Sequence, residues 1–253
     1  MIDRSSIAQA RSLAVLTGAG ISAESGVPTF RGEGGLWRSY RAEDLATPHA
    51  FRRDPRLVWE WYDWRRGVIG GCQPNAAHST LADMEGHLSD FVLITQNVDG
   101  LHRLAGSRRI VELHGNIWRM RCTRGCRSPW EDRSYPLPGI PPHCPDCGAL
   151  ARPDVVWFGE PLPGAALDEA FAAVQRCQVL LVVGTSAMVQ PAASLPLMAM
   201  QRGAYVVEIN PQSTLLSGEV DQAICEPAAV ALPNWWRAWL AEGKRQPTSE
   251  ETS

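Results

Sequence analysis

The chain has 253 residues, of which 45% are hydrophobic and 20% are charged, and its formal net charge is −3. This composition is typical of a folded globular protein with one sizeable core and a small appended module. The slight acidity argues against a basic nucleic-acid-binding surface, no apolar run has the length of a membrane span, and the first residues show no signal pattern. We therefore expect a cytoplasmic protein with no direct nucleic-acid partner and no membrane partner.

A glycine-rich segment at 17–31 follows the apolar run 13–16, which predicts a buried strand. Gly18 and Gly20 would let backbone N–H groups approach a pyrophosphate. The segment lacks the third glycine of the ordinary dinucleotide fingerprint, and no strand ending in an acidic residue follows about 20 residues later. It continues instead into Pro-Thr-Phe-Arg at 28–31. We therefore predict a dinucleotide site of an unusual kind.

Residues 32–73 predict a helical insertion, within which Asp54 and Pro55 begin a helix. Aspartate is a favoured N-cap, and proline is favoured at the first helical position. Apolar side chains at helical spacing predict that one stripe of this helix faces the core. That stripe comprises Leu57, Trp61, Trp64 and Val68.

Tyr62 and Arg65 are three residues apart on the adjacent stripe, so both side chains project from one face of this helix. Together they could bind a carboxylate, because the guanidinium fork and the tyrosine hydroxyl both donate hydrogen bonds. The alternative is that Arg65 and Arg66 are solvated and pair with Asp63 or Glu60.

Apolar runs elsewhere predict buried parallel strands that alternate with helices. Continuous apolar character suits strands that are covered on both faces, and the alternation implies a doubly wound, mostly parallel, Rossmann-like α/β sheet. The expected strands are 12–16, 91–95, 110–113, 179–183, 204–209 and 223–225, and the expected helices are 75–87, 164–176, 190–202 and 233–242.

Polar or glycine residues follow five of the predicted strands, at 17–18, 96–99, 114–115, 184–186 and 210–211. In open α/β sheets, ligands bind beyond the carboxyl ends of the strands. Any one of these sets could be an ordinary turn. Because all five occur together, we expect them to line a binding site.

Four of the seven cysteines form two close pairs, Cys122 with Cys126 and Cys144 with Cys147, separated by seventeen residues. Four thiolates in two pairs suit tetrahedral Zn²⁺ and leave no open position, which indicates a structural ion. The proline-rich loop between the pairs cannot supply a core, so we expect the metal to hold this module together.

These features divide the chain into a sheet domain and a smaller domain. The predicted Rossmann-like domain covers 1–31, 74–117 and 153–242. The helical insertion 32–73 and the zinc module 118–152 form the smaller domain, and 243–253 is expected to be a disordered tail.

Three motifs occur together in this chain: GAGISAESGVPTFRG at 18–32, QNVD at 96–99 with HG at 114–115, and the paired cysteines followed by RPDVVWFGE at 152–160. Their order and types resemble the sirtuins, the NAD-dependent protein lysine deacylases, over about residues 12–233. The Tyr-x-x-Arg at 62–65 resembles class III of that family. The resemblance implies NAD as cofactor, one structural zinc ion, and acyl-lysine proteins or peptides as substrates.

The resemblance also implies roles for individual residues. His114 would be the general base, which suits an imidazole whose pKa is near neutral, although a histidine at a strand end is often only structural. NAD would contact Gly18, Ala19, Gly20, Ser22, Ala23, Gly26, Pro28, Phe30, Arg31, Trp37, Gln96, Asn97, Asp99, Gly184, Thr185, Ser186, Asn210 and Ala228. The peptide would pair as an added strand with the edge formed by Val155, Val156, Phe158, Gly159 and Glu160.

Class III sirtuins bind acidic acyl groups, which implies that Tyr62 and Arg65 hold the acid end while the small Ala46 leaves room. The expected reaction removes succinyl or malonyl groups, with glutaryl as a further candidate, and also acetyl groups, and it releases nicotinamide and O-acyl-ADP-ribose. Alternatives are a protein deacetylase or a mono-ADP-ribosyltransferase on the same scaffold, or a module that binds NAD or ADP-ribose without turning it over.

Overall fold

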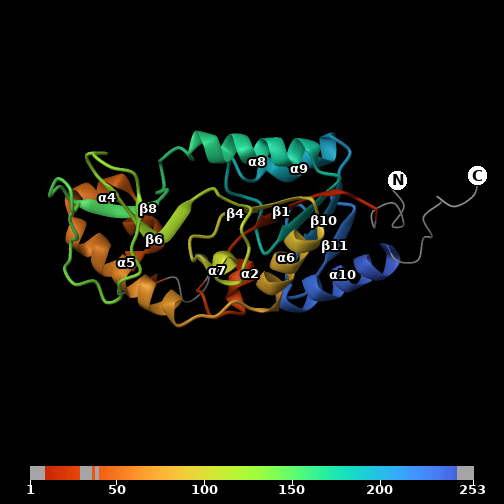
Figure 1. The fold of residues 1–253 in the computed structure, drawn as a ribbon, viewed down its shortest axis with the longest axis horizontal. Helices are drawn as coiled ribbons and strands as arrows, with labels where there is room; N and C mark the ends of the chain where they lie inside the picture. The colour runs from red at the N-terminus through yellow and green to blue at the C-terminus, as the bar shows by residue number, and fades with distance from the viewer. Residues whose placement is uncertain (1–8, 29–35, 38–39, 244–253) are drawn as a thin grey trace, which may run out of the picture.

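A six-stranded parallel sheet forms the larger part of the molecule (Figure 1). The computed structural model describes residues 9–28, 36–37 and 40–243. The strand order is β11-β10-β9-β1-β4-β5, and all neighbouring strands are parallel. The strands are β1 (Ser12–Thr17), β4 (Asp90–Thr95), β5 (Ile110–Glu112), β9 (Val179–Val183), β10 (Tyr205–Ile209) and β11 (Gln222–Ile224).

Helices cover both faces of this sheet (Figure 1). Side chains of α6 (Ala76–His87) and α10 (Ala228–Gly243) share one apolar cluster with the sheet. Side chains of α8 (Gly164–Arg176) and α9 (Ser194–Gln201) share a second cluster on the opposite face. The predicted doubly wound α/β fold is therefore confirmed.

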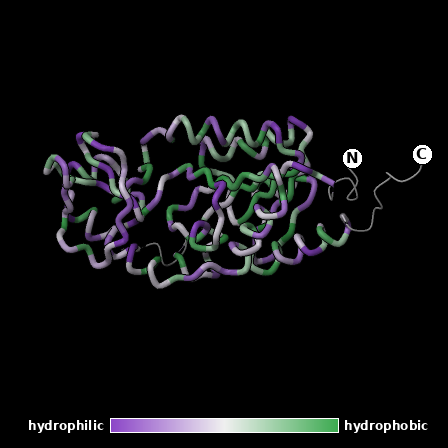
Figure 2. The backbone as a smooth tube through the Cα atoms, viewed as in Figure 1, coloured by the Kyte–Doolittle hydropathy of each residue, from purple (hydrophilic) through white to green (hydrophobic). Residues whose placement is uncertain are grey.

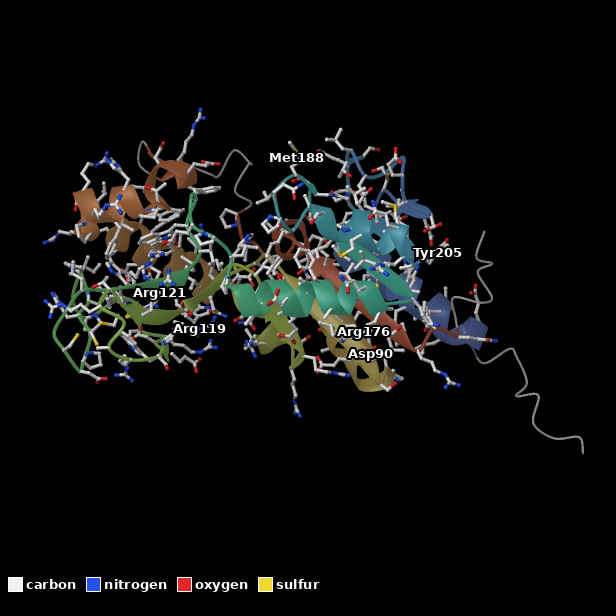
Figure 3. The ribbon with its side chains drawn as sticks, turned by 90° about the horizontal axis from the view of Figure 1, so that it is seen from above. Asp90, Arg119, Arg121, Arg176, Met188 and Tyr205 are labelled. Carbon is white, nitrogen blue, oxygen red and sulfur yellow. The ribbon has the colours of Figure 1, made fainter. Side chains whose placement is uncertain are left out.

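The strands are buried because they are apolar on both sides. All five residues of β9 are buried, and Figure 2 shows hydrophobic colour along the central strands. Each predicted strand lies within one residue of the observed bounds. An ion pair between Arg176 of α8 and Asp90 of β4, with Nε–Oδ2 3.2 Å, joins a helix end to a strand start (Figure 3).

Two helices begin four or five residues away from the predicted positions, whereas α6 begins one residue later than predicted. α10 begins at Ala228 rather than 233, because the N–H of Ala231 donates to Pro227 O and Pro233 lies inside the helix. α9 begins at Ser194 rather than 190, and residues 190–193 form a turn before it. None of the described helices combines the length and the apolar character needed to cross a membrane.

The smaller part of the molecule contains a three-stranded antiparallel sheet and several helices (Figure 1). Its strand order is β7-β6-β8. Arg119 of β6, labelled in Figure 3, pairs both with Asp154 in this sheet and with Glu112 in the larger one. The elements are β2 (Leu36–Trp37), β3 (Tyr40–Arg41), α3 (Ala42–Leu45), α4 (Pro48–Arg53), α5 (Pro55–Gly70), β6 (Gly115–Cys122), β7 (Trp130–Glu131) and β8 (Ala151–Val155).

Helix α5 begins as predicted, since the Asp54 side chain accepts the N–H of Leu57 and Pro55 occupies the first turn. The predicted core stripe is only partly right. Trp61 is buried, but Leu57, Trp64 and Val68 are only half-buried. The buried face instead comprises Val58, Trp59, Trp61, Tyr62, Arg66 and Ile69. Apolar residues of α5 occur on most sides of the helix, so their spacing in the sequence could not identify which face is buried.

Arg66 is fully buried, so the interpretation of this residue as a solvated arginine was wrong. Its Nε donates to Ile117 O at 3.0 Å and its Nη1 to Asp132 Oδ1 at 2.8 Å. Burial lowers the pKa of this guanidinium, and the Asp132 carboxylate opposes that shift. Together with the bond from Trp59 Nε1 to Ala151 O, these contacts attach α5 to the small sheet.

Candidate functional site

Two glycine loops meet where the adjacent strands β1 and β9 end. The N–H of Gly18 donates to Val183 O at 3.1 Å and that of Gly20 to Gly184 O at 2.8 Å. A Cβ on Gly20 would lie 2.7 Å from Gly184 Cα, and one on Gly184, where φ is +62°, would lie 2.3 Å from Ile21 N. The two loops therefore require glycine at the point of contact. The sequence suggested that the N–H groups of Gly18 and Gly20 bind a pyrophosphate. In the structure they donate hydrogen bonds to carbonyl groups of the protein instead.

Ser22, Asn97 and Asp99 form a hydrogen-bonded group beside these loops. Ser22 Oγ donates to Asp99 Oδ2 at 2.8 Å, and Asn97 Nδ2 donates to Gly18 O at 3.0 Å and to Ser22 Oγ at 3.3 Å. The other Asp99 oxygen accepts the N–H of Leu101, and burial raises the pKa of this carboxyl. The segment after β4 is thus held against the glycine loop of β1.

Two buried histidines, His78 of α6 and His102 of α7 (Leu101–Leu104), pack next to this group. Neither was predicted from the sequence. His78 Nε2 lies 3.3 Å from Ser22 Oγ, His102 Nε2 lies 3.0 Å from Thr17 Oγ1, and the two rings are 4.9 Å apart. Burial lowers the pKa of His78 to about 4 and that of His102 to about 3, so both are neutral near pH 7. A histidine alone in a helix carries no sequence signal of such packing.

His114 lies just beyond β5, at the same edge of the sheet. Its Nδ1 is 2.9 Å from Gln96 O. A carbonyl only accepts hydrogen bonds, so Nδ1 carries the proton and Nε2 has a lone pair for a further proton. Burial lowers the pKa of His114, and the bond to Gln96 opposes that shift. The ring is therefore a neutral base near pH 7.

The ends of β4, β9 and β10 are joined through Thr185. Gln96 Nε2 donates to Thr185 Oγ1 at 3.0 Å, and Asn210 Nδ2 donates to Thr185 O at 3.0 Å. Ser186 follows directly, and Ala228 is buried at the start of α10. Glu24 of the glycine segment accepts the N–H of Ala229, which brings that helix start to the same region.

The remaining predicted NAD contacts in the described part of the chain include residues in and next to α2 (Gly20–Ala23). Ala19 is the N-cap of this helix, whereas Ala23, Gly26 and Pro28 are exposed. Phe30 and Arg31 lie outside the described residues. For Trp37 the structure describes only the backbone, which lies in β2.

The predicted peptide edge follows β8 and is partly occupied by internal contacts. The N–H of Val156 donates to His114 O, and that of Phe158 donates to Ala46 O, both at 2.9 Å. The Phe158 side chain is exposed, and a Cβ on Gly159 would meet nothing within 4 Å. Val155 ends β8 and is buried.

Glu160, the last predicted residue of the peptide edge, is bound inside the loop. Its carboxylate pairs with Arg152 through contacts of 2.6 and 2.9 Å and accepts the N–H of Trp157 at 2.9 Å. The Glu160 carboxylate therefore stabilises the turn after β8.

Tyr62 and Arg65 share one face of α5, as predicted. Tyr62 is 3% exposed, and its hydroxyl accepts a hydrogen bond from Trp157 Nε1 at 2.9 Å. Burial raises the pKa of Tyr62 to about 12 and lowers that of Arg65, and the negative charge of Asp99 opposes the shift of Arg65. Ala46 is also buried. This tyrosine–arginine pair therefore lies within electrostatic range of the Asp99 group.

The four predicted metal ligands converge at one point. The sulfur atoms of Cys122, Cys126, Cys144 and Cys147 all lie within 4.8 Å of one another. Cys126 Sγ is 3.5, 3.4 and 3.3 Å from the other three. A tetrahedral Zn²⁺ with Zn–S bonds of about 2.3 Å requires sulfur separations of about 3.8 Å, so the cluster fits one structural zinc ion.

Comparisons with known proteins agree with this geometry. The family model described as "Sir2 family" matches residues 18–191. NAD-dependent protein deacylase 1 of Caldanaerobacter subterraneus subsp. tengcongensis is 56% identical over 216 residues, which cover 85% of this chain and 89% of that protein. A crystal structure of a Sir2 homolog–NAD complex matches with a TM-score of 0.88 and 47% identity, over 96% of each chain. A Sir2–p53 peptide–NAD⁺ complex matches with a TM-score of 0.79 and 32% identity, over 94% of this chain and 95% of that one.

We predict that Gly20→Ala destabilises the protein by about 1–3 kcal/mol, because the new methyl group would overlap the backbone of Gly184. Urea unfolding measures the change. The control is Gly86→Ala, a position inside α6 where a Cβ meets nothing within 4 Å, and this variant should gain roughly 0.5–1 kcal/mol. Similar effects in both variants would contradict the predicted role of the glycine contact.

We predict that Cys122→Ser lowers both bound zinc and thermal stability, because a structural zinc site contributes folding energy through all of its ligands. Zinc content by atomic absorption and melting by circular dichroism provide the measurements. The control Cys225→Ser changes an exposed cysteine outside the cluster and should leave both values unchanged. Retention of full zinc by Cys122→Ser would show that Cys122 is not a ligand.

Proposed function

The chain belongs to the Sir2 family, the sirtuins, and on that premise we propose that it is an NAD-dependent protein lysine deacylase with a preference for acidic acyl groups. Similar proteins are named NAD-dependent protein deacylases. The proposed substrates are proteins or peptides that carry succinyl-, malonyl- or glutaryl-lysine, with acetyl-lysine as a further substrate. A matching structure holds a p53 peptide together with NAD⁺, which supports peptides as ligands here.

The polar residues at the carboxyl edge of the parallel sheet fit a dinucleotide. Bound NAD would supply a ribose carbon that becomes electrophilic when nicotinamide leaves. We propose that Ser22, Asn97 and Asp99 surround the nicotinamide half, because their hydrogen bonds join them into one group beside the glycine loop. Thr185 and Asn210 would hold the adenosine half, together with Ser186 and Ala228. In this proposal the predicted sheet domain binds NAD, while the smaller domain carries zinc and most of the acyl site.

His114 is the proposed general base. Its Nδ1–H bond to Gln96 O fixes the tautomer and leaves Nε2 as the proton acceptor. Burial keeps the ring neutral, which a base requires. This feature favours a catalytic protein over a module that binds NAD without turnover.

The observation that carries the acyl preference is the pair of buried Tyr62 and half-buried Arg65 on one face of α5. Burial disfavours the charge of Arg65, so an anion beside it would stabilise that charge. A carboxylate at the end of an acyl chain would accept hydrogen bonds from both side chains. An acetyl group has no such carboxylate and would gain nothing from the pair.

We predict that His114→Ala abolishes deacylation and that wild-type kcat/KM falls at acid pH. The neutral imidazole is the active form, and its pKa is lowered from 6.5, so the activity should persist below pH 6.5 before it falls. Nicotinamide release from an acyl-lysine peptide, measured against pH, provides the test. His87→Ala, at an exposed histidine of α6, should retain activity. An acid limb centred above pH 6.5 would contradict the assignment.

We predict that Arg65→Met lowers kcat/KM for a succinyl-lysine peptide tenfold to a hundredfold more than for the matched acetyl-lysine peptide, since a hydrogen bond to a charged group contributes about 1.5–3 kcal/mol. The control is Arg56→Met on the same helix. The Arg56 side chain is 72% exposed and forms a salt bridge with Glu60. Equal losses on both peptides with Arg65→Met would reject a carboxylate site.

A further inference from the structure

We propose that Trp157 is a positioning residue that directs the hydroxyl proton of Tyr62 toward the acyl carboxylate and so contributes to the selection of acidic acyl groups. This inference rests on the proposed function, because it concerns the same acyl site. The roles predicted from the sequence fall on the residues on either side of Trp157 and not on Trp157 itself.

The indole of Trp157 and the hydroxyl of Tyr62 differ in their hydrogen-bonding capacity. Trp157 Nε1 lies 2.9 Å from the Tyr62 hydroxyl oxygen, which is 95 positions away in the sequence. An indole N–H only donates, whereas a tyrosine hydroxyl has one proton to donate and lone pairs to accept. In this contact the hydroxyl must therefore be the acceptor. Its own proton is left to point at a different acceptor.

That second acceptor is missing from the part of the chain that the structure describes, where Trp157 is the only hydrogen-bond partner found for the Tyr62 hydroxyl. The side chain is 3% exposed, so bulk water has little access to it. A buried hydroxyl proton without an acceptor is costly, and a carboxylate held beside Arg65 would supply one. The acetyl group offers no oxygen at the corresponding end of the chain.

The hydroxyl also has to remain protonated to act as a donor. Arg65 and Arg152 both favour its ionisation, but burial outweighs them and raises the pKa of Tyr62 to about 12. Tyr62 is thus a neutral donor throughout the physiological range. Arg65 would supply the charge for the carboxylate, and Tyr62 would supply a directed hydrogen bond.

The indole itself is held from several sides, so the direction of its N–H is set before any substrate binds. The backbone N–H of Trp157 donates to Glu160 Oε2 at 2.9 Å. The Arg152 guanidinium lies 3.3 Å from the centre of the ring, and Arg152 pairs with both oxygens of Glu160. The ring centres of Phe51 and Trp157 are 5.2 Å apart. Together these contacts hold the indole with its N–H directed at Tyr62.

A double-mutant cycle on the full-length protein tests the inference. The variants are Trp157→Phe, which removes the N–H but keeps an aromatic ring, Tyr62→Phe, and the combination. Each is assayed with one peptide that carries either succinyl- or acetyl-lysine. We expect Trp157→Phe to lower kcat/KM about tenfold more for the succinyl peptide, mainly through KM, because one directed hydrogen bond is weakened. In the Tyr62→Phe background, Trp157→Phe should cause no further selective loss.

Two results would overturn the inference. An equal loss on both peptides would show that Trp157 only supports the fold, and an undiminished selective loss in the Tyr62→Phe background would show that it does not act through the hydroxyl. Arg65→Met separates this inference from the proposed function. If Arg65→Met is selective and Trp157→Phe is not, only the role of Trp157 fails, whereas an unselective Arg65→Met rejects the carboxylate site and the role of Trp157 with it.

A second measurement on the wild-type protein applies if Trp157→Phe does not fold. The indole N–H signal of Trp157 can be followed by ¹H–¹⁵N NMR and assigned through its change in Tyr62→Phe. The succinyl-lysine peptide should shift this signal further than the matched acetyl-lysine peptide does, because both peptides bind beside Trp157 but only the first brings a carboxylate to Tyr62. Equal shifts with both peptides, or no shift with either, would contradict the inference.

Discussion

The contact between the two glycine loops is the constraint on which the site depends. Strands β1 and β9 are neighbours in the sheet, and their following loops touch backbone to backbone at Gly20 and Gly184. Any side chain at these positions would separate the loops. Because the loops stay close, Asn97 reaches the carbonyl of Gly18, and the polar residues after β1, β4 and β9 meet at one edge of the sheet. The same closeness uses the N–H groups of Gly18 and Gly20 internally.

Helix α5 connects the metal module with the proposed acyl site because its faces have different partners. One face carries Trp59 and Arg66, whose hydrogen bonds reach Ala151 O, Ile117 O and the Asp132 carboxylate. Another carries Tyr62 and Arg65. The docking of α5 on the small sheet therefore sets where the tyrosine–arginine pair lies. A structural zinc ion in this part would act on the acyl site through packing, with no chemical step of its own.

Burial keeps the histidines of the site uncharged. Burial strongly lowers the pKa values of His78 and His102, which contact Ser22 and Thr17. Burial also lowers the pKa of His114. Neutral rings can exchange hydrogen bonds with the Ser22 and Thr17 hydroxyl groups without burying a positive charge. The one arginine proposed to meet substrate, Arg65, is held apart from them on the smaller part of the molecule.

The sequence by itself determined the strands of the parallel sheet, the start of α5, the glycine positions and the cysteine cluster. Each depends on chemistry within a few residues: apolar runs, an N-cap, the absence of a side chain, or the spacing of thiols. Only the tertiary structure decided that Arg66 is buried, that His78 and His102 support the site, and that Trp157 bonds to Tyr62. Those features arise from contacts between residues far apart in the chain, so no local pattern records them. The hydrogen bond of Tyr62 is the clearest case, because its partner lies on a loop of a different element, 95 residues later.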